Sequence, residues 1–218
     1  MKKISFILLA LLCWSSMVSA QENNNRLRKK YRNLSFVKQE FEPASYFGMD
    51  QTLKSNFGAA FTVGRTFYLP KKPIRFGLDA TWFDLNYTNY KLEYRWEDNY
   101  DEEEEPETSN FHQAEIGMQV GPSVTVNPVG KLNVNAYFRF APSFSALYDD
   151  DTLLGNYASY FVTGGGISYG VIGLGVESRW GSCKFKSFGG GDSEEDEQEP
   201  EPGKSKFNGM RVYLSFRF

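Results

Sequence analysis

The sequence is poor in cysteine and histidine and, beyond residue 20, has no long apolar run. Its two cysteines are Cys13, inside an apolar N-terminal stretch, and Cys183. A chain that keeps one cysteine after export cannot build a disulfide framework or a zinc site of several cysteine ligands. A transmembrane helix is also excluded, because it needs about 18 or more consecutive apolar residues. Helical periodicity is nowhere as strong as the alternation described below.

The first twenty residues form the one long apolar segment. Lys2 and Lys3 precede an apolar run over residues 4–14, and Val18 and Ala20 supply the small residues of a cleavage site. This order predicts a secretory signal peptide over residues 1–20. The mature chain is then exported and begins at residue 21.

Acidic residues are concentrated in three clusters. The chain has 24 basic and 27 acidic residues, and 97–107, 149–151 and 192–201 together hold 18 of the acidic ones. Blocks of like charge repel one another and stay solvated, so these clusters predict loops. Carboxylates suit hard cations, but the clusters lack the ligand spacing and the glycine of a calcium loop. We therefore expect no metal site and no cofactor.

Between the clusters the sequence alternates with a period of two, as half-buried strands do. Two of the predicted strands are irregular. One lies within 33–47 and ends near Phe41, because Pro43 cannot take a central ladder position. The other covers 157–167, where we expect the glycines 164–166 to relieve crowding or permit a bend. Six regular strands bring the total to eight and cover 56–68, 74–83, 113–120, 132–140, 172–180 and 210–218.

The connections between these strands alternate in length. The short ones are 69–73, 127–131 and 168–170, and the long ones are the segment after the first strand, 88–110, 148–156 and 186–207. An even number of strands of about 9–11 residues, with short turns on one side and long loops on the other, is typical of bacterial outer-membrane barrels. We expect an all-β, closed eight-stranded antiparallel barrel in the outer membrane, with short periplasmic turns and long acidic exterior loops.

The expected domain organisation follows from these boundaries. Residues 1–20 are the signal peptide, 21–32 an N-terminal periplasmic segment and 33–218 the barrel. The rival fold is a soluble eight-stranded barrel that binds a ligand inside. It is disfavoured because charged residues recur on one face of the strands and large apolar residues on the other, so a soluble version would bury the charges or expose an apolar band.

The alternation directs a set of charged side chains into the lumen. The interior of an eight-stranded barrel is just wide enough for side chains to fill. We therefore expect an ion-paired plug, which also disfavours a porin. Arg65 is the exception, since it falls on the apolar face near a turn. The predicted lumen charge network comprises Arg75, Asp79, Glu115, Arg139, Glu177, Arg179 and Arg211.

The end of the sequence, "GMRVYLSFRF", resembles the C-terminal recognition signal of outer-membrane barrels. The resemblance implies that Tyr213, Phe216 and Phe218 form a barrel-assembly signal read by the outer-membrane assembly machinery. The segments "FGLDATWFDLNY", "GPSVTVNP", "NAYFRFAPSFSALY" and "NYASYFVTGGG" resemble small, uncharacterised outer-membrane β-barrel domain proteins of Gram-negative bacteria, similar in size to the OmpA and OmpX kind. That family has no established reaction, so the resemblance implies no catalytic residue.

We expect a non-enzymatic structural or surface-interaction role through the acidic exterior loops. The expected partners are outer-membrane lipid and lipopolysaccharide, the assembly machinery during insertion, and a protein at the barrel wall or at the loops, but no nucleic acid. One alternative is an accessory subunit of a larger outer-membrane complex. Another is a lipid A modifying enzyme that uses His112, with Ser109 three residues before it. The deacylase pattern places a serine two residues after the histidine, where "FHQAE" has Ala114.

Overall fold

The computed structural model describes residues 28–44, 51–69, 74–94, 107–149, 152–187 and 203–218. Within these ranges every regular element is a strand, and no helix is long and apolar enough to cross a membrane. The predicted signal peptide and nearly all of the three acidic clusters lie outside the described residues.

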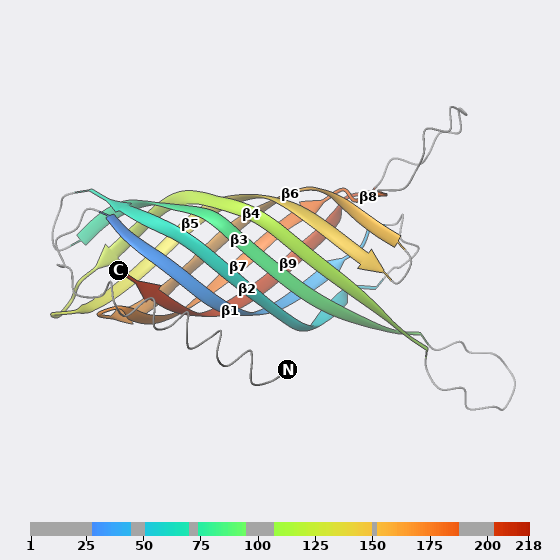
Figure 1. Ribbon diagram of the computed structural model, residues 1–218, viewed down its shortest axis with the longest axis horizontal. Helices are drawn as coiled ribbons and strands as arrows, with labels where there is room; N and C mark the ends of the chain where they lie inside the picture. Colours follow the sequence, from blue (N-terminus) through green and yellow to red (C-terminus); the bar gives the residue numbers. More distant parts are fainter. Residues whose placement is uncertain (1–27, 45–50, 70–73, 95–106, 150–151, 188–202) are drawn as a thin grey trace, which may run out of the picture.

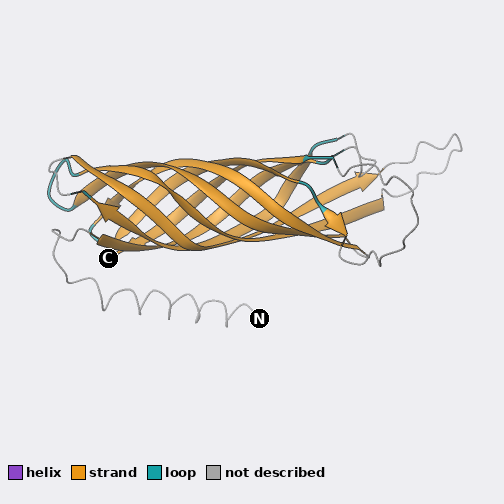
Figure 2. Cartoon of the chain, turned by 90° about the horizontal axis from the view of Figure 1, so that it is seen from above, coloured by secondary structure: helices purple, strands orange, loops and turns teal. Residues whose placement is uncertain are grey.

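Eight long strands close into a single antiparallel barrel (Figures 1 and 2). Each strand pairs with its neighbour in the chain, and β9 pairs with both β1 and β7 to complete the ring. The short β8 pairs only with β6. The predicted fold class is therefore confirmed. The bounds are β1 Arg28–Glu42, β2 Leu53–Tyr68, β3 Ile74–Tyr94, β4 Glu107–Val126, β5 Leu132–Asp149, β6 Thr152–Tyr169, β7 Ile172–Cys183, β8 Lys186–Ser187 and β9 Ser205–Arg217.

Several strands are longer than their sequence pattern predicts. β1 begins at Arg28, inside the expected periplasmic segment 21–32. β3 and β4 remain paired as far as Tyr94 and Glu107, so both ends of the expected loop 88–110 belong to a hairpin that extends past the neighbouring strands (Figure 1). The expected loop 148–156 is wrong, because β5 and β6 pair up to Asp149 and Thr152. Residues 28–30 are all basic and have no apolar face, but the backbone ladder that they form needs none.

The two ends of the barrel differ in their connections, although the expected alternation of short and long connections fails between β5 and β6. The short connections after β4 and β6 lie at one end, here called the turn end, and use Gly130 and Gly170 with positive φ of 54° and 62°. Glycine enters this region without the steric penalty of other residues. Both ends of the described chain also lie there, because the N–H of Lys30 donates to the carbonyl of Phe218 at 2.7 Å. The connections after β1, β3, β5 and β8 lie at the opposite, loop end, and they are longer except for the one after β5, which spans residues 150–151.

The strands are strongly staggered around the ring. Following paired residues from Leu34 through β2, β3, β4 and β5 leads to Tyr157 on β6. Following them through β9 and β7 leads instead to Ile167 on the same strand. The shear is thus about 10 residues, which corresponds to strands tilted by roughly 35–45° and an interior filled by side chains.

Along most of its length the barrel is apolar outside and polar inside. Exposed large apolar side chains surround all eight long strands, whereas the inward positions carry buried polar and charged groups. We call this outer band the apolar belt. Its members include Phe36, Phe61, Phe76, Leu78, Trp82, Leu85, Ile116, Met118, Phe138, Ile167, Leu174, Val176, Val212 and Leu214.

Toward the loop end this polarity inverts. On β1, Lys38, Glu40 and Glu42 point outward while Phe41 is fully buried inside. β2 and β9 change in the same way, with Leu53 and Phe207 inside and charged neighbours outside. The barrel therefore continues beyond its apolar belt as a section built like a soluble barrel, which the single alternation rule of the sequence analysis did not predict.

Glycines let tyrosine rings lie flat against the inner wall. A Cβ on Gly175 would lie 2.3 Å from the ring of Tyr213, and one on Gly164 would lie 2.6 Å from the hydroxyl of Tyr137. Real Cβ contacts are never this close, so any larger residue would displace the ring. The expected role of the glycines 164–166 in relieving crowding agrees with this geometry.

Candidate functional site

The lumen holds all seven predicted charged residues. Each has at most 8% of its surface exposed. The strands that carry them lie on all sides of the ring, so the alternation alone brings them to the barrel axis. Six of the seven belong to two polar networks, one nearer the turn end and one nearer the loop end.

The first network is centred on two arginines. Arg139 donates to the carboxylate of Asp79 at 2.6 Å and to the side-chain oxygen of Gln119 at 3.0 Å. Its guanidinium also lies 3.6 Å from the ring centroid of Tyr137. Ser123 donates to the other oxygen of Asp79 at 2.9 Å, so this buried carboxylate is well satisfied.

Arg211 bridges two carboxylates from different strands. It donates to Asp84 on β3 and to Glu177 on β7, each at 3.0 Å. Gln119 donates to Asp84 at 2.8 Å, and Tyr137 donates to Glu177 at 2.8 Å. These bonds connect Arg211 to the Arg139 group in one continuous network across the lumen.

Asp84 was missed because β3 contains a bulge. The register of β3 against β4 shifts between Thr81 and Asp84, so Trp82 and Phe83 both avoid the lumen. An extra residue in one strand reverses the alternation that follows it. The sequence does carry a signal: two consecutive aromatic residues followed by a new alternation that places Asp84, Asn86, Thr88 and Tyr90 inside.

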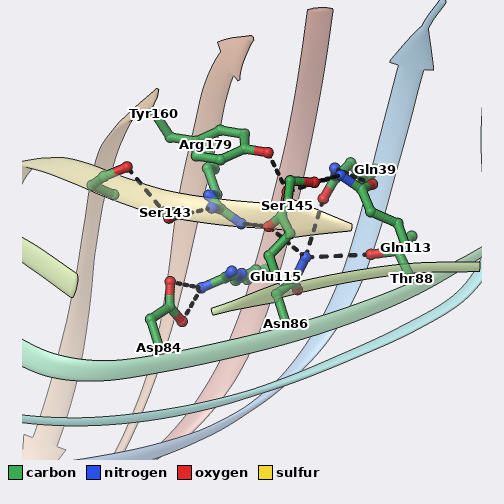
Figure 3. A network of polar contacts seen from close by, with 12 residues as sticks. Gln39, Asp84, Asn86, Thr88, Gln113, Glu115, Ser143, Ser145, Tyr160 and Arg179 are labelled. Atoms are coloured by element: carbon green, nitrogen blue, oxygen red, sulfur yellow. Dashed lines mark hydrogen bonds and ion pairs between the residues drawn. The ribbon is translucent and has the colours of Figure 1, made fainter. Parts of the chain in front are cut away.

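The second network surrounds Glu115 (Figure 3). Arg179 and Tyr160 both donate to this carboxylate, and Gln113 donates to it at 2.9 Å. The guanidinium of Arg179 also lies 3.6 Å from the ring centroid of Tyr160. The hydroxyl of Tyr90 donates to Gln113 at 2.7 Å. Uncharged polar side chains thus complete the shell around one buried ion pair.

Arg75 lies apart from both networks. It sits near the turn end, where it donates to Asn127 at 3.1 Å and lies 5.3 Å from the ring centroid of Tyr68. The prediction that Arg75 faces the lumen is confirmed, and the structure places it at the mouth of the lumen.

An aromatic plug closes the lumen above the second network, toward the loop end. The ring of Phe41 stacks on that of Phe207 at 5.0 Å and meets Phe185 edge-on at 6.3 Å. Tyr90 and Tyr160 complete the layer, and all five residues have no more than 3% of their surface exposed. We call these five residues the aromatic plug. The sequence pattern did not predict this plug, because the alternation assigns apolar residues to the outer face throughout.

Together the networks and the plug fill the barrel. Charges taken out of water are tolerated when they are paired and hydrogen-bonded, and Asp79, Asp84, Glu115 and Glu177 each meet an arginine. Within the described ranges no group of three or more potential metal-ligating side chains comes together. The lumen is arranged as a packed, electrostatically cross-linked core.

His112 lies on the opposite side of the barrel wall. Its ring faces outward and is half-buried, and its Nδ1 lies 2.8 Å from the hydroxyl of Tyr87 and 3.5 Å from the side-chain nitrogen of Asn89. Among the described side chains it has no carboxylate partner. Ser109 lies in β4, but its side chain is outside the described set.

The predicted assembly residues divide between the two faces of β9. Tyr213 is 3% exposed and points into the lumen, where its hydroxyl donates to the carbonyl of Gly165 at 3.2 Å. Phe216 and Phe218 lie on the outer face at the turn end and are half-buried. Arg32 on β1 lies 5.7 Å from the ring centroid of Phe218. Recognition by an assembly machinery stays a prediction.

No protein-family model matches the chain, and no curated protein matches its sequence. Solved structures that resemble it are outer-membrane proteins. The outer membrane protease OmpT from Escherichia coli has a TM-score of 0.48 and 9% identity, covering 91% of this chain and 99% of OmpT. Neisserial surface protein A has a TM-score of 0.44 and 12% identity over 88% of this chain and 96% of its own. The attachment invasion locus protein Ail of Yersinia pestis has a TM-score of 0.41 and 5% identity over 88% and 100%. The fold itself rests on the strand pairing described above, and likenesses this distant assign no activity.

Proposed function

We propose that this protein is an integral outer-membrane β-barrel with a sealed lumen and a non-enzymatic structural or surface-interaction role at its loop end. The observation that carries the proposal is the combination of a continuous apolar belt outside with ion-paired side chains inside. A monomeric soluble protein rarely exposes apolar patches larger than a few hundred Å². In a bilayer the same belt meets lipid, and ring closure leaves no open sheet edge facing it.

The filled lumen supports a role that needs no passage of solutes. The pairs Arg211–Asp84 and Arg179–Glu115 cross-link strands that are not neighbours in the ring, and the aromatic plug covers them toward the loop end. Contacts with the exterior are then made by the part of the barrel that continues beyond the apolar belt and by the connections it carries. The acidic clusters of the sequence belong to these connections.

A catalytic role is not favoured by the contacts of His112. A histidine that activates a serine is normally oriented by a carboxylate. The described partners of His112 are instead a phenol and an amide. We therefore keep a non-enzymatic role as the proposal.

An accessory role in a larger complex has one observation in its favour. Phe138, Phe140, Phe161 and Trp180 form a continuous aromatic surface on the outer wall of β5, β6 and β7, with ring centroids 5.6–6.4 Å apart. Aromatic residues are enriched in protein interfaces. We call these four residues the aromatic surface.

Purification from native outer membranes in a gentle detergent distinguishes the two roles. For a free-standing barrel, mass spectrometry of the purified material shows this chain with lipid and no other protein at comparable amount. A second barrel or a lipoprotein in fixed ratio would contradict the free-standing role and support the accessory subunit. Exchanging Phe138 and Phe161 for leucine would then identify the aromatic surface as the contact, if the partner is lost.

A further inference from the structure

A groove of about 720 Å³ opens on the outer wall between β6, β7, β9 and β1. Its lining changes character from one end to the other. Phe161 and Trp180 form the part nearest the apolar belt, whereas Lys204 and Lys206 lie toward the loop end. The groove therefore lies at the level where the outer wall of the barrel changes from apolar to charged.

Lysines are concentrated beside this groove. Lys184, Lys186, Lys204 and Lys206 are all exposed and come from the loop ends of β7, β8 and β9 and the segments beside them. We call these four residues the lysine rim. Glu40 and Glu42 on β1 are the acidic residues that line the groove, so the rim and the groove together carry excess positive charge.

The ion pair already present in the groove leaves its lysine accessible. Lys206 lies 2.9 Å from the carboxylate of Glu42, but the two side chains are 66% and 57% exposed. Exposed pairs of this kind contribute little, commonly less than about 1 kcal/mol. A phosphate group offers more negative charge and more acceptor oxygens than one carboxylate and can displace it from the ammonium group.

The apolar end of the groove continues into the aromatic surface. The ring of Phe161 lies 6.4 Å from that of Trp180 and 5.8 Å from that of Phe138, which belongs to the apolar belt. An elongated apolar chain extending from the groove toward the middle of the belt thus has aromatic rings beneath it. The site suits a molecule with an anionic head and apolar tails.

The uncharged polar lining indicates the kind of head group. Ser159, Ser182, Thr52 and Asn208 line the groove between the aromatic residues and the lysines. Hydroxyl and amide groups suit the hydroxyls of a sugar, whereas the head group of a simple glycerophospholipid offers fewer such partners. The four positive charges of the rim also suit more than one phosphate.

We propose that this groove binds one phosphorylated glycolipid of the outer leaflet, with phosphate on the lysine rim, sugar against the hydroxyl-lined middle and acyl chains on the aromatic surface. The inference rests on the proposed function, because it requires the loop end to face the exterior leaflet. It adds a defined lipid site to a barrel that otherwise presents only a general apolar belt.

The test compares the lipid retained by variants purified from native outer membranes. The wild-type protein is expected to keep about one phosphorylated glycolipid per chain through a detergent wash, measured by native mass spectrometry. The variant with Lys204→Ser and Lys206→Ser is expected to retain about tenfold less, because two charge-assisted contacts are lost. The control, Lys91→Ser with Lys131→Ser, removes two exposed lysines that do not line the groove, one on β3 and one at the turn after β4, and is expected to retain the wild-type amount.

Failure of this inference is distinguishable from failure of the proposed function. All four substituted side chains are exposed, so each variant is expected to keep the heat-sensitive gel mobility of a folded barrel. A folded wild-type barrel that retains no glycolipid, or a groove variant that retains as much as its control, would overturn the site alone. Retention of phosphatidylethanolamine in place of glycolipid would overturn the glycolipid assignment. A wild-type chain that forms no heat-sensitive barrel would overturn the proposed function itself.

Discussion

Replacing Arg211 with methionine is expected to destabilise the barrel by about 3–5 kcal/mol, because it removes the positive partner of two buried carboxylates. Asp84 and Glu177 are each 3.0 Å from the Arg211 guanidinium and are at most 5% exposed. Without the arginine, two carboxylates from β3 and β7 face each other in a water-poor interior. The free energy of unfolding, measured by urea titration of the protein folded in lipid vesicles, checks the prediction.

Two further variants show whether the loss of stability in Arg211→Met comes from the uncompensated charges. Adding Asp84→Asn and Glu177→Gln to Arg211→Met removes the uncompensated charges, and much of the lost stability is expected to return. Lys206→Met removes an exposed charge on the same strand, and its effect is expected to stay below about 1 kcal/mol. If Arg211→Met is no more destabilising than Lys206→Met, the ion pairs do not cross-link the lumen.

Replacing Phe207 with alanine in the aromatic plug is expected to lower the free energy of unfolding by about 3–5 kcal/mol. Phe207 is 3% exposed and contacts Phe41, Phe185 and Tyr160 through its ring. The change opens a cavity in a layer held by its neighbours on several strands, so the site cannot collapse fully. The same urea titration provides the measurement.

Phe207→Leu is the matched control for the plug. It keeps most of the buried apolar volume and is expected to cost less than about 1.5 kcal/mol. A small, equal effect of both substitutions would mean that the rings at the loop end are not a packed core. The structural basis for an exterior seal would then be lost.

The sequence predicts the number of strands, their antiparallel order and the charged residues that face the lumen. It does so because a strand with one apolar and one polar face has a hydropathy pattern of period two. Every predicted lumen charge is buried. The lumen-facing residue that the sequence did not predict lies where that pattern is interrupted. Asp84 enters the lumen only through the bulge at Trp82 and Phe83, which reverses the alternation in the middle of β3.

The section of the barrel beyond the apolar belt was not predicted for a different reason. There the inward residues, such as Phe41 and Phe207, are apolar and the outward ones are charged. The period of two is unchanged, but here the apolar residues face the lumen and the charged residues face outward. Alternation alone does not show which face of a strand is the inner one. Residues 88–94 and 107–110 flank an acidic cluster and were therefore assigned to a loop, although their backbone groups pair in a regular ladder.

Electrophoresis of isolated outer membranes, with and without boiling, tests the closed membrane-embedded barrel most directly. A closed β-barrel resists unfolding by detergent at room temperature, so the unboiled protein is expected to migrate faster than the boiled protein. Identical mobility of the two samples, or absence of the protein from the outer-membrane fraction, would contradict it.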